Sequence, residues 1–507
     1  MSFQMPFNQY DFSGGMNNRD SNALLKDNES PDMRNMVLGK RGTFETAPGV
    51  VLFRQVPVDD VNVPVTGLYE YITQAGEEYF LAYAGGKLKK AITGNWQLIK
   101  DEFTDGTYPE FVTHSIVDKA LFVNGKDGYW ETDGITANEV VPYEPTPEEI
   151  TESGDCVIPD DPSLIAYHKY RVWLSGISAY PDRIYYCIDD IDGNTLYNYF
   201  TATSWIRSAN PKGEGVTALM AFKEMLLIFT KTTVKRLVGD DLSDFAMIDY
   251  NTSVGTVSQR SVWNAGDYLI FLGVDGVYMC DGANAPFKVS QRIEETTRAI
   301  SLLHRHRACA MLKDGKYFCS VPLSTVNNLT LMFDTDITPI EYIGEKYSYA
   351  NSPWVLLDGF VPTQWIVRLN LNAYFSSVDG YVYQYGIGNT YNGLKIEDYY
   401  TTKYFDFGLP DRRKRIRRMN LDFDPHPGSF LHVYYKADHD DEWTFMAEVD
   451  VSTNDFRFVS FPTGKGPLCR KIAFKFASAY TGSRIRVNGF ELDVAVHGQQ
   501  RQVEKAG

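Results

Sequence analysis

Histidine is the residue type in this chain best suited to hold a metal ion or to move a proton near neutral pH. The sequence has eight histidines, and the one close group is the segment His304-Arg305-His306-Arg307. A zinc site needs further ligands at a set spacing, as in the pattern His-Glu-x-x-His, and the sequence does not contain that pattern. We therefore interpret the histidine pair as part of a polar surface segment that follows a helix.

Clustered aspartates offer a second kind of chemistry, because carboxylates are suitable ligands for Ca²⁺. The densest cluster is Asp189-Asp190-Ile191-Asp192-Gly193-Asn194. An EF-hand loop places its glycine later and ends on a glutamate, whereas here Gly193 comes too early and no glutamate closes the loop. Asx turns, in which a carboxylate accepts hydrogen bonds from nearby backbone, explain these residues without a metal. The sequence predicts neither a metal site nor a cofactor.

Glycosidases use two carboxylates that meet only in the folded protein, so no sequence spacing identifies such a pair. The segment Ser377-Val378-Asp379-Gly380 comes nearest to the Ser-x-Asp-x-Gly-x-x-Trp boxes of sialidase-like propellers, but its glycine is one residue early and the tryptophan is missing. The chain also lacks a Gly-x-Ser-x-Gly nucleophile motif, a Walker loop and a dinucleotide fingerprint. These observations favour a protein that is not an enzyme.

A basic run between residues 412 and 418 is the strongest local charge feature of the sequence. Its cations are our candidate assembly or partner contacts: Arg412, Arg413, Lys414, Arg415, Arg417 and Arg418. Three interpretations are open. The run could contact an acidic partner, it could contact DNA, or it could be a strand with a solvated basic face whose arginine stems cover apolar surface.

Net charge and cysteine usage limit the classes of function. The 507-residue chain has a formal net charge of −16, which argues against broad nucleic-acid binding because phosphate contacts need Lys and Arg. The first residues lack the basic start and apolar core of a secretory signal, and no apolar run reaches the roughly 18–20 residues that span a bilayer. The six cysteines lie far apart, and Cys280 and Cys319 fall within strand patterns. We interpret those two as buried apolar residues in a chain that folds in a reducing cytosol.

Repeated strand and turn signals indicate the elements that must position any functional surface. Asp-Gly pairs at Asp127, Asp275, Asp314 and Asp379 lie next to apolar or aromatic strands, and Asp-Gly suits a tight type I′ hairpin. Seven candidate units open with an apolar strand, about 45–57 residues apart, which is the repeat length of four-stranded propeller blades. These strands begin near Val65, His114, Leu164, Val216, Val262, Ala308 and Trp365. The sequence therefore predicts an all-β protein with a β-propeller of six or seven blades over residues 61–395.

The flanking segments follow different patterns. Residues 1–60 are rich in turn signals, and we expect this segment to pack on the propeller or to pair with a strand from elsewhere. Short alternating strands over 396–498 predict an antiparallel β-sandwich, and 499–507 a flexible tail.

Three segments interrupt the predicted blades. The stretch 142–162 is rich in proline and glutamate and predicts an acidic loop, and 291–307 is the best helical candidate. We expect the long loops at 142–162 and 334–353 to serve in contacts or in gating.

Several stretches together carry a resemblance to a known family. They are Gly14-Gly15-Met16-Asn17-Asn18, Asn35-Met36-Val37-Leu38-Gly39-Lys40-Arg41-Gly42, Pro48-Gly49, Gly239-Asp240-Asp241-Leu242-Ser243-Asp244-Phe245, Val254-Gly255-Thr256-Val257-Ser258-Gln259-Arg260-Ser261-Val262, Phe271-Leu272-Gly273-Val274-Asp275-Gly276-Val277-Tyr278, and Phe405-Asp406-Phe407-Gly408 before Arg412-Arg413-Lys414-Arg415. These stretches resemble the tail-nozzle, or tail-stabilisation, proteins of short-tailed bacteriophages. The shared motifs are turns and strands, so they say nothing of catalysis.

The resemblance implies a structural virion protein that is assembled in the cytoplasm of the host bacterium as a ring, usually sixfold, at the distal end of the tail. Such a ring extends the DNA channel below the portal and adaptor, retains the genome and lets it pass during ejection. The implied partners are other copies in a homohexamer, the tail adaptor and portal complex, further tail proteins such as fibres, a spike or a needle, and double-stranded DNA in transient passage without sequence-specific binding. An acidic lumen would repel phosphate and let DNA slide.

A receptor- or glycan-binding propeller is the alternative function. Its sequence cue is the abundance of aromatic residues, because aromatic faces can stack on sugars, although they also fill cores. The tryptophans near predicted strand ends are Trp130, Trp173, Trp263, Trp354 and Trp365.

Overall fold

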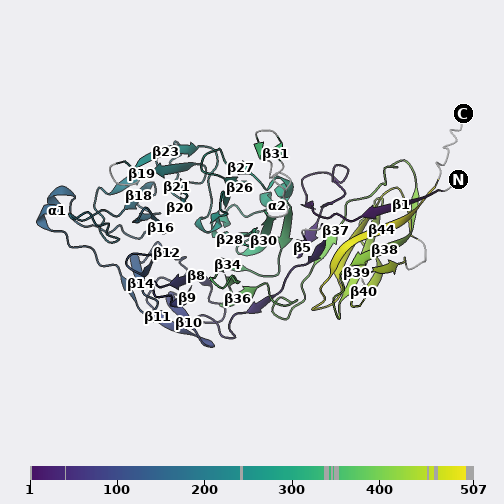
Figure 1. Cartoon of the computed structure of the whole chain (residues 1–507), viewed down its shortest axis with the longest axis horizontal. Coiled ribbons are helices and arrows are strands. Elements are labelled where there is room, and N and C mark those ends of the chain that lie inside the picture. The colour runs from purple at the N-terminus through teal and green to yellow at the C-terminus, as the bar shows by residue number, and fades with distance from the viewer. Residues whose placement is uncertain are drawn as a thin grey trace.

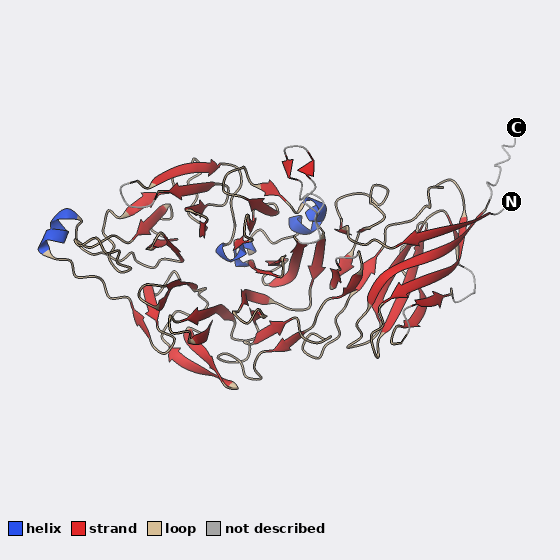
Figure 2. Cartoon of the chain, in the orientation of Figure 1, coloured by secondary structure: helices blue, strands red, loops and turns tan. Residues whose placement is uncertain are grey.

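The computed structural model describes residues 3–39, 42–239, 244–335, 342–343, 346–347, 353–453, 456–461 and 466–497. It is an elongated all-β molecule with a ring of small sheets at one end and two packed sheets at the other (Figures 1 and 2). Both ends of the described chain lie at the tip of the two-sheet body that is farthest from the ring (Figure 1).

Seven four-stranded antiparallel sheets form the ring in the described part of the chain, and each is a blade of a β-propeller. The strands of blades 1 to 3 are β8 (Val65–Ile72), β9 (Glu78–Ala84), β10 (Lys87–Ile92), β11 (Asn95–Lys100); β12 (Glu110–His114), β13 (Lys119–Val123), β14 (Tyr129–Thr132), β15 (Ala137–Glu139); β16 (Leu164–His168), β17 (Arg171–Ser175), β18 (Arg183–Tyr186) and β19 (Trp205–Arg207). The predicted fold class is confirmed, and the blade count is seven.

Blades 4 to 7 follow in chain order, with one exception in the last blade. Their strands are β20 (Ala218–Phe222), β21 (Met225–Phe229), β22 (Val234–Val238), β23 (Ala246–Asn251); β24 (Trp263–Asn264), β25 (Leu269–Leu272), β26 (Val277–Cys280), β27 (Phe287–Lys288); β28 (Cys309–Lys313), β29 (Lys316–Pro322), β30 (Asn327–Asp334), β33 (Trp354–Leu357); β34 (Pro362–Val367), β35 (Ala373–Ser377), β36 (Val382–Tyr385) and β7 (Val50–Leu52).

Neighbouring blades bury each other's second strands. In β21 every residue from Leu226 to Phe229 is buried, as the continuous apolar sequence predicts. The ring of Phe229 packs against that of Phe271 in the next blade, with the two centroids 5.3 Å apart. Full burial of one such side chain contributes about 1.5–3 kcal/mol. The sheets therefore stabilise one another, and a single blade would leave apolar surface in water.

The propeller closes through a strand that precedes the first blade in the sequence. In blade 7, β7 is the outermost strand, and Val50 pairs with Tyr385 while Leu52 pairs with Tyr383. The predicted propeller boundary at residue 61 is therefore wrong. The last blade supplies only three strands from its own segment, and β7 covers the edge that would otherwise remain unpaired.

The second body is an antiparallel β-sandwich, as predicted. One sheet contains β41 (Phe456–Val459), β38 (Lys414–Phe423), β44 (Arg486–Val496), β6 (Phe44–Thr46) and β5 (Met36–Leu38), with β1 (Phe3–Gln9) paired to β44 and β42 (Leu468–Cys469) paired to β38. The other contains β4 (Met33–Arg34), β37 (Tyr399–Thr401), β43 (Ile472–Ser478), β39 (Phe430–Ala437) and β40 (Thr444–Asp450).

The N-terminal segment at 1–60 contributes strands to both bodies, so the predicted pairing with strands from elsewhere is confirmed. The alternative that it only packs on the propeller is wrong. Four of its strands lie in the sandwich and one closes the propeller. Phe44 shows the physical reason, because it is fully buried and stacks on Tyr400 with ring centroids 4.4 Å apart. The segment also contacts the propeller, since the amide of Asn35 donates to the carbonyl of Leu356 in blade 6 at 2.9 Å. A further parallel pair joins β2 (Gly15–Met16) and β3 (Glu29–Ser30).

The acidic loop at 142–162 contains a short helix, α1 (Pro147–Glu152). Thr146 caps this helix, and Glu149 completes a capping box by accepting a hydrogen bond from the amide of Thr146 at 2.6 Å. The helix lies at the end of the molecule opposite the sandwich (Figure 1).

The predicted helix over 291–307 is broken into short segments. They are η2 (Gln291–Ile293), α2 (Glu294–Arg298) and η3 (Arg305–Arg307). The amide of Ser301 donates to the carbonyl of Pro322 in blade 6 at 2.8 Å, so the backbone there pairs with the blade and does not continue the helix.

Parts of two predicted segments lie outside the described residues. They are the tail at 499–507 and most of the loop at 334–353, of which the structure describes the hairpin β31 (Tyr342–Ile343) and β32 (Lys346–Tyr347).

The Asp-Gly pairs all lie in turns between strands, but only one has the predicted type I′ geometry. Asp314 and Gly315 both have positive φ, at 50° and 69°. At the other three pairs the glycine alone has positive φ, and the loop is longer than two residues. Their carboxylates hold nearby side chains instead: Asp275 accepts from the hydroxyl of Tyr278 at 2.8 Å, and Asp379 from that of Tyr383 at 2.6 Å.

Candidate functional site

The aspartate cluster at 189–194 is a turn. Asp190 accepts a hydrogen bond from the amide of Asn194 at 2.7 Å, and Asp189 pairs with Arg171 at 2.6 Å. Within the residues that the structure describes, no group of three or more His, Cys, Asp or Glu side chains is placed to hold a metal ion.

The two histidines of the 304–307 segment have different surroundings in the structure. His304 lies 3.2 Å from the hydroxyl of Ser301, whereas His306 lines a cavity near the propeller axis. His306 is an exposed residue of this segment, although partial burial of its ring and the neighbouring Arg307 lower its pKa. Cys280 and Cys319 are buried in strands, as predicted, and burial raises the pKa of each thiol to about 12.

The six cations of the basic run do not share one surface. Arg413, Arg417 and Arg418 are exposed, and Arg412 and Arg415 are partly buried. The run therefore offers three exposed arginines, one just before β38 and two within it.

Lys414 is fully buried and is not available to a partner, which corrects its place among the candidate contacts. Its ammonium donates to the carbonyl oxygens of Asp406 at 2.7 Å and of Leu409 at 2.6 Å. Burial lowers the pKa of this amine. Lys414 thus fixes the loop that precedes β38.

A β-bulge explains why two consecutive arginines face solvent. Ile416 pairs with Val494 and Arg418 with Asp493, so Arg417 is the extra residue between them. The guanidinium of Arg418 also lies 5.5 Å from the ring centroid of Phe458. The bulge turns part of the run into an exposed basic surface on the seven-stranded sheet.

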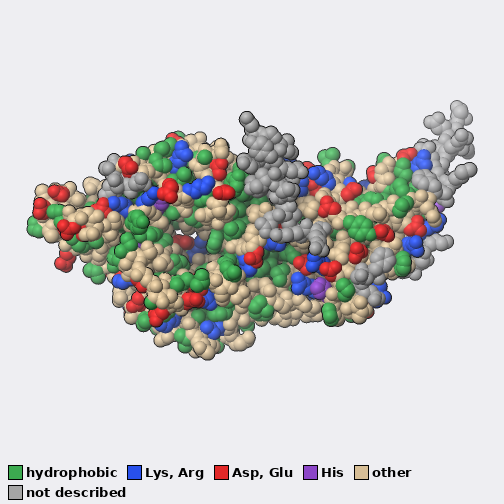
Figure 3. Space-filling view, in the orientation of Figure 1, with side chains coloured by type: hydrophobic (Ala, Val, Ile, Leu, Met, Phe, Trp, Pro, Cys, Tyr) green, Lys and Arg blue, Asp and Glu red, His purple; other side chains and the backbone are tan. Residues whose placement is uncertain are grey.

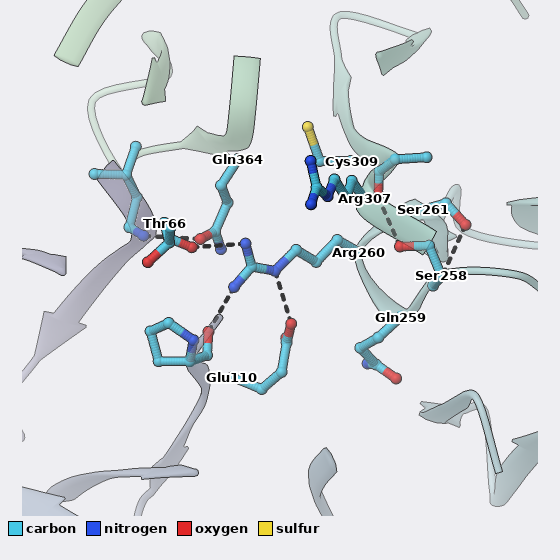
Figure 4. A network of polar contacts seen from close by, with 12 residues as sticks. Thr66, Glu110, Ser258, Gln259, Arg260, Ser261, Arg307, Cys309 and Gln364 are labelled. Carbon is cyan, nitrogen blue, oxygen red and sulfur yellow. Dashed lines mark hydrogen bonds and ion pairs between the residues drawn. The ribbon is translucent and has the colours of Figure 1, made fainter. Parts of the chain in front are cut away.

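A buried arginine crosses the propeller axis (Figure 4). Arg260 lies in η1 (Gln259–Ser261), ahead of blade 5, and its Nε pairs with Glu110 of blade 2 at 2.8 Å. Its Nη1 donates to the carbonyl of Thr66 in blade 1 at 2.7 Å, and its Nη2 to that of Pro109 at 2.8 Å. The side chains of Arg260 and Glu110 are only 8% and 19% exposed. We call these two residues the axial pair.

The axial pair separates two cavities. The larger one, of about 460 Å³, is lined mainly by residues that precede first strands, and we call it the axial cavity. The second, of about 290 Å³, is lined by first-strand residues such as Trp263 and Trp365. Glu110, Gln259 and Arg260 line both cavities, so these side chains lie between the two spaces at the propeller centre. Figure 3 shows an opening in the surface near the propeller centre.

The axial cavity carries an excess of positive charge in an otherwise acidic chain. Besides the axial pair, its ionised lining residues are Lys126 and Arg307. Arg307 donates to the carbonyl of Thr325 at 2.7 Å, and Lys126 is exposed. The structure gives neither cation a carboxylate partner among the described residues. An anionic ligand is thus the type that this cavity would favour.

Sequence reasoning did not identify the residues that join blades around the axis. The amide oxygen of Gln259 accepts from the backbone of Leu219 at 2.8 Å. The amide oxygen of Gln364, which Figure 4 shows beside Arg260, accepts from the backbone of Leu68 at 2.8 Å. In each case the glutamine side chain contacts the first strand of a neighbouring blade. Blades 5 and 7 share one sequence signal for these contacts, which is a glutamine within three residues of the start of the predicted first strand. Nothing in a single sequence distinguishes Arg260 from a surface arginine.

Three of the five tryptophans proposed as sugar-stacking residues fill blade interiors. Trp173, Trp354 and Trp365 are fully buried. Their indole N–H groups donate to the carbonyls of His168 and Val289 and to the hydroxyl of Ser320, respectively. This part of the aromatic cue for a glycan-binding propeller is wrong.

An exposed aromatic cluster lies on the sandwich instead. The side chains of Phe445 and Tyr480 are 45% and 52% exposed, and the imidazole of His432 lies between them, with ring centroids 5.4 Å and 6.0 Å away. The carboxylate of Glu448 is 2.9 Å from His432 Nε2 and accepts from the hydroxyl of Tyr480 at 2.6 Å. We call these four residues the aromatic face.

No family model and no curated protein matches this sequence. Similar solved structures include the WD40 domain of Pan2 from Neurospora crassa, with 10% identity over 67% of this chain and 95% of that one and a TM-score of 0.38. BamB from Moraxella catarrhalis has 11% identity over 70% and 96%, with a TM-score of 0.38. The WD40 β-propeller domain of Doa1 has 10% identity over 66% and 97%, with a TM-score of 0.40. At these identities the likeness concerns the fold alone.

No helix in the described part of the chain is long and apolar enough to cross a membrane.

Proposed function

We propose that this chain is a structural subunit of the tail nozzle of a short-tailed bacteriophage. In this proposal six copies form a ring at the distal end of the tail, below the portal and adaptor. The ring retains the packaged genome and later lets double-stranded DNA pass, and the chain catalyses no reaction.

The contacts across the propeller axis are the observation that carries the proposal. The axial pair and its carbonyl partners join the segment ahead of blade 5 to blades 1 and 2 across the centre, so a DNA duplex does not pass through the propeller itself. In this proposal the DNA channel lies between copies, and each chain forms part of its wall. The net charge of −16 suits such a wall, because a negative surface repels phosphate and lets DNA slide.

The shared N-terminal segment also supports a structural role. Because β7 closes the propeller while β1, β5 and β6 lie in the sandwich, the two bodies are joined twice along the chain. The exposed Arg413, Arg417 and Arg418 then remain for contact with an acidic partner, such as the adaptor or another tail protein.

Electron microscopy of tails that contain this chain tests the proposal. We expect a closed ring on the tail axis, with subunit surfaces and not propeller holes lining the channel. Copies placed singly or in trimers at the periphery of the tail would contradict it. A ring whose lumen is uniformly basic would remove the part that concerns the acidic wall.

The aromatic face favours a second function, the binding of a glycan receptor. Phe445 and Tyr480 present aromatic surface to solvent, and Glu448 is already oriented to accept hydrogen bonds. Binding of cell-surface polysaccharide by the purified chain, lost in Phe445→Ala with the fold intact, would support this function. Equal binding by Phe445→Ala would remove it.

A further inference from the structure

The acidic loop at 142–162 is a projecting surface with charge of one sign. Its sequence contains no Lys or Arg. The exposed acidic residues are Glu144, Glu148, Glu152, Asp155, Asp160 and Asp161. Figure 1 places α1 at the tip of the propeller, and acidic side chains gather at that tip in Figure 3. So many like charges on one projection repel each other and favour a positively charged partner.

The loop has a fixed shape in spite of this repulsion. Glu149 is its one buried acid, and its carboxylate accepts from the amides of Thr146 at 2.6 Å and Ile191 at 2.9 Å. These bonds hold α1 against blade 3. Ile150 and Val157 remain exposed among the acids, so the loop presents apolar as well as acidic side chains.

The mouth of the axial cavity has the opposite charge and similar apolar features. Lys126 and Arg307 line it, and Lys231 lies near His306, which also lines it. The segment that leads into η3 exposes Leu302 and Leu303, which are 80% and 75% exposed. The cations come from three different parts of the ring, so they are spread around the mouth.

We propose that the acidic loop of one copy docks in the axial cavity of a neighbouring copy. The many carboxylates of the loop match cations that are spread around the mouth, whereas a single phosphate would reach only some of them. The apolar side chains of the loop would contact Leu302 and Leu303. Glu149 fixes the loop on the rim of its own propeller, so the contact is between copies. It rests on the proposed function, because a repeated contact of two different surfaces closes into a ring.

A peptide tests the contact without requiring a ring. The probe is residues 141–162 with Cys156→Ser, labelled with a fluorophore, titrated with the purified full-length chain. We expect saturable binding that weakens as NaCl rises from about 0.05 M to about 0.5 M, because exposed charges are screened. In Lys126→Glu/Lys231→Glu we expect binding about tenfold weaker or more.

The basic run on β38 provides the matched control. Arg417→Glu/Arg418→Glu changes the net charge by the same amount at another exposed surface, and we expect it to bind the peptide as the wild-type chain does. If this variant loses binding while Lys126→Glu/Lys231→Glu keeps it, the loop docks on the sandwich and the proposal is wrong.

Charge exchange in the whole chain tests the contact in its folded form. One variant, Glu144→Lys/Glu148→Lys/Glu152→Lys, replaces three negative charges of the loop by positive ones and retains Glu149. The other, Lys126→Glu/Lys231→Glu, replaces two positive charges at the cavity mouth by negative ones. We expect each variant alone to assemble about tenfold more weakly than wild type in sedimentation velocity. An equal mixture should assemble again, because the basic loop of one variant fits the acidic mouth of the other.

The two proposals fail in different ways. Rings formed by both variants alone, at wild-type concentrations, would overturn the docking contact and leave the nozzle function standing. Peptide binding with the expected charge dependence, together with tails that contain no ring of this chain, would uphold the contact and remove the nozzle. An equal mixture of the two charge-reversed variants that assembles no better than either variant alone would overturn the contact.

Discussion

The propeller and the sandwich are both completed by strands from the first 52 residues, but by very different amounts of structure. The propeller receives β7, which forms three residue pairs with β36 at the outer edge of blade 7. The sandwich receives four strands, among them β1, which forms seven residue pairs with β44. Phe12 and Phe44 from this segment are fully buried in a core that continues from the sandwich into blades 5 to 7.

This difference indicates where each body draws its stability. Every blade of the propeller packs against two others, and the axial pair adds a contact across the centre, so its stability is distributed around the ring. The sandwich depends on one N-terminal segment for strands in both of its sheets. Changes to that segment should therefore affect the sandwich most.

Removal of residues 1–47 should have the largest effect. The shortened chain keeps β7 but loses β1, β4, β5 and β6, so we expect the sandwich to unfold while the propeller retains its blades. The loss is comparable to the whole stability of a domain, about 5–15 kcal/mol. Scanning calorimetry should show one unfolding transition fewer, and proteolysis should leave a fragment that starts near residue 48. A sandwich that still unfolds cooperatively would contradict the comparison.

Phe44→Ala should produce the next largest effect. Phe44 is fully buried and stacks on Tyr400, so truncation leaves a cavity, and we expect a loss of about 3–5 kcal/mol in the free energy of unfolding. Phe445→Ala is the matched control on the same body, because its ring is 45% exposed, and it should cost less than about 1 kcal/mol. Denaturant unfolding of both variants measures the difference, and equal losses would count against a core built on the N-terminal segment.

The difference between the two bodies also explains which strands and contacts can be predicted from the sequence. The second strand of a blade can be predicted where it is a continuous apolar run bounded by turns, and β21 lies at residues 225–229, where that pattern places it. β5, β6 and β7 have only three residues each, too short for any periodicity, and β6 and β7 pair with β44 and β36, which lie hundreds of residues away. Charge patterns have the same limit: the basic run is visible in the sequence, but the burial of Lys414 depends on two carbonyls of a loop. The axial pair joins residues 150 positions apart and has no local signal.

Arg260→Met tests whether the axial pair contributes to closure of the propeller. The variant leaves Glu110 largely buried without its cation and leaves two carbonyls without a donor. We expect a loss of about 3 kcal/mol, at the lower end for a broken buried ion pair because Glu110 retains some exposure. Calorimetry should assign this loss to the propeller transition and not to that of the sandwich. Arg260→Met/Glu110→Gln removes the unpaired charge and should recover part of the stability. A loss confined to the sandwich transition would contradict the role of the pair.

The substitution Asp398→Asn should have the smallest effect on stability, and it changes how the stability of the sandwich depends on pH. The buried carboxylate of Asp398 accepts from the hydroxyl of Thr46 in β6 at 2.5 Å and from the amide and hydroxyl of Ser478 in β43. Burial raises the pKa of Asp398 above its usual 3.8 in spite of these hydrogen bonds. The folded chain then binds a proton more tightly than the unfolded chain, so this stabilisation is complete below the unfolded pKa and is lost as pH rises through the folded pKa. We expect Asp398→Asn to weaken the fall in sandwich melting temperature over that interval, while the propeller transition keeps its pH dependence. If the sandwich transition has the same pH dependence in the wild-type chain and in Asp398→Asn, Asp398 is not the group responsible.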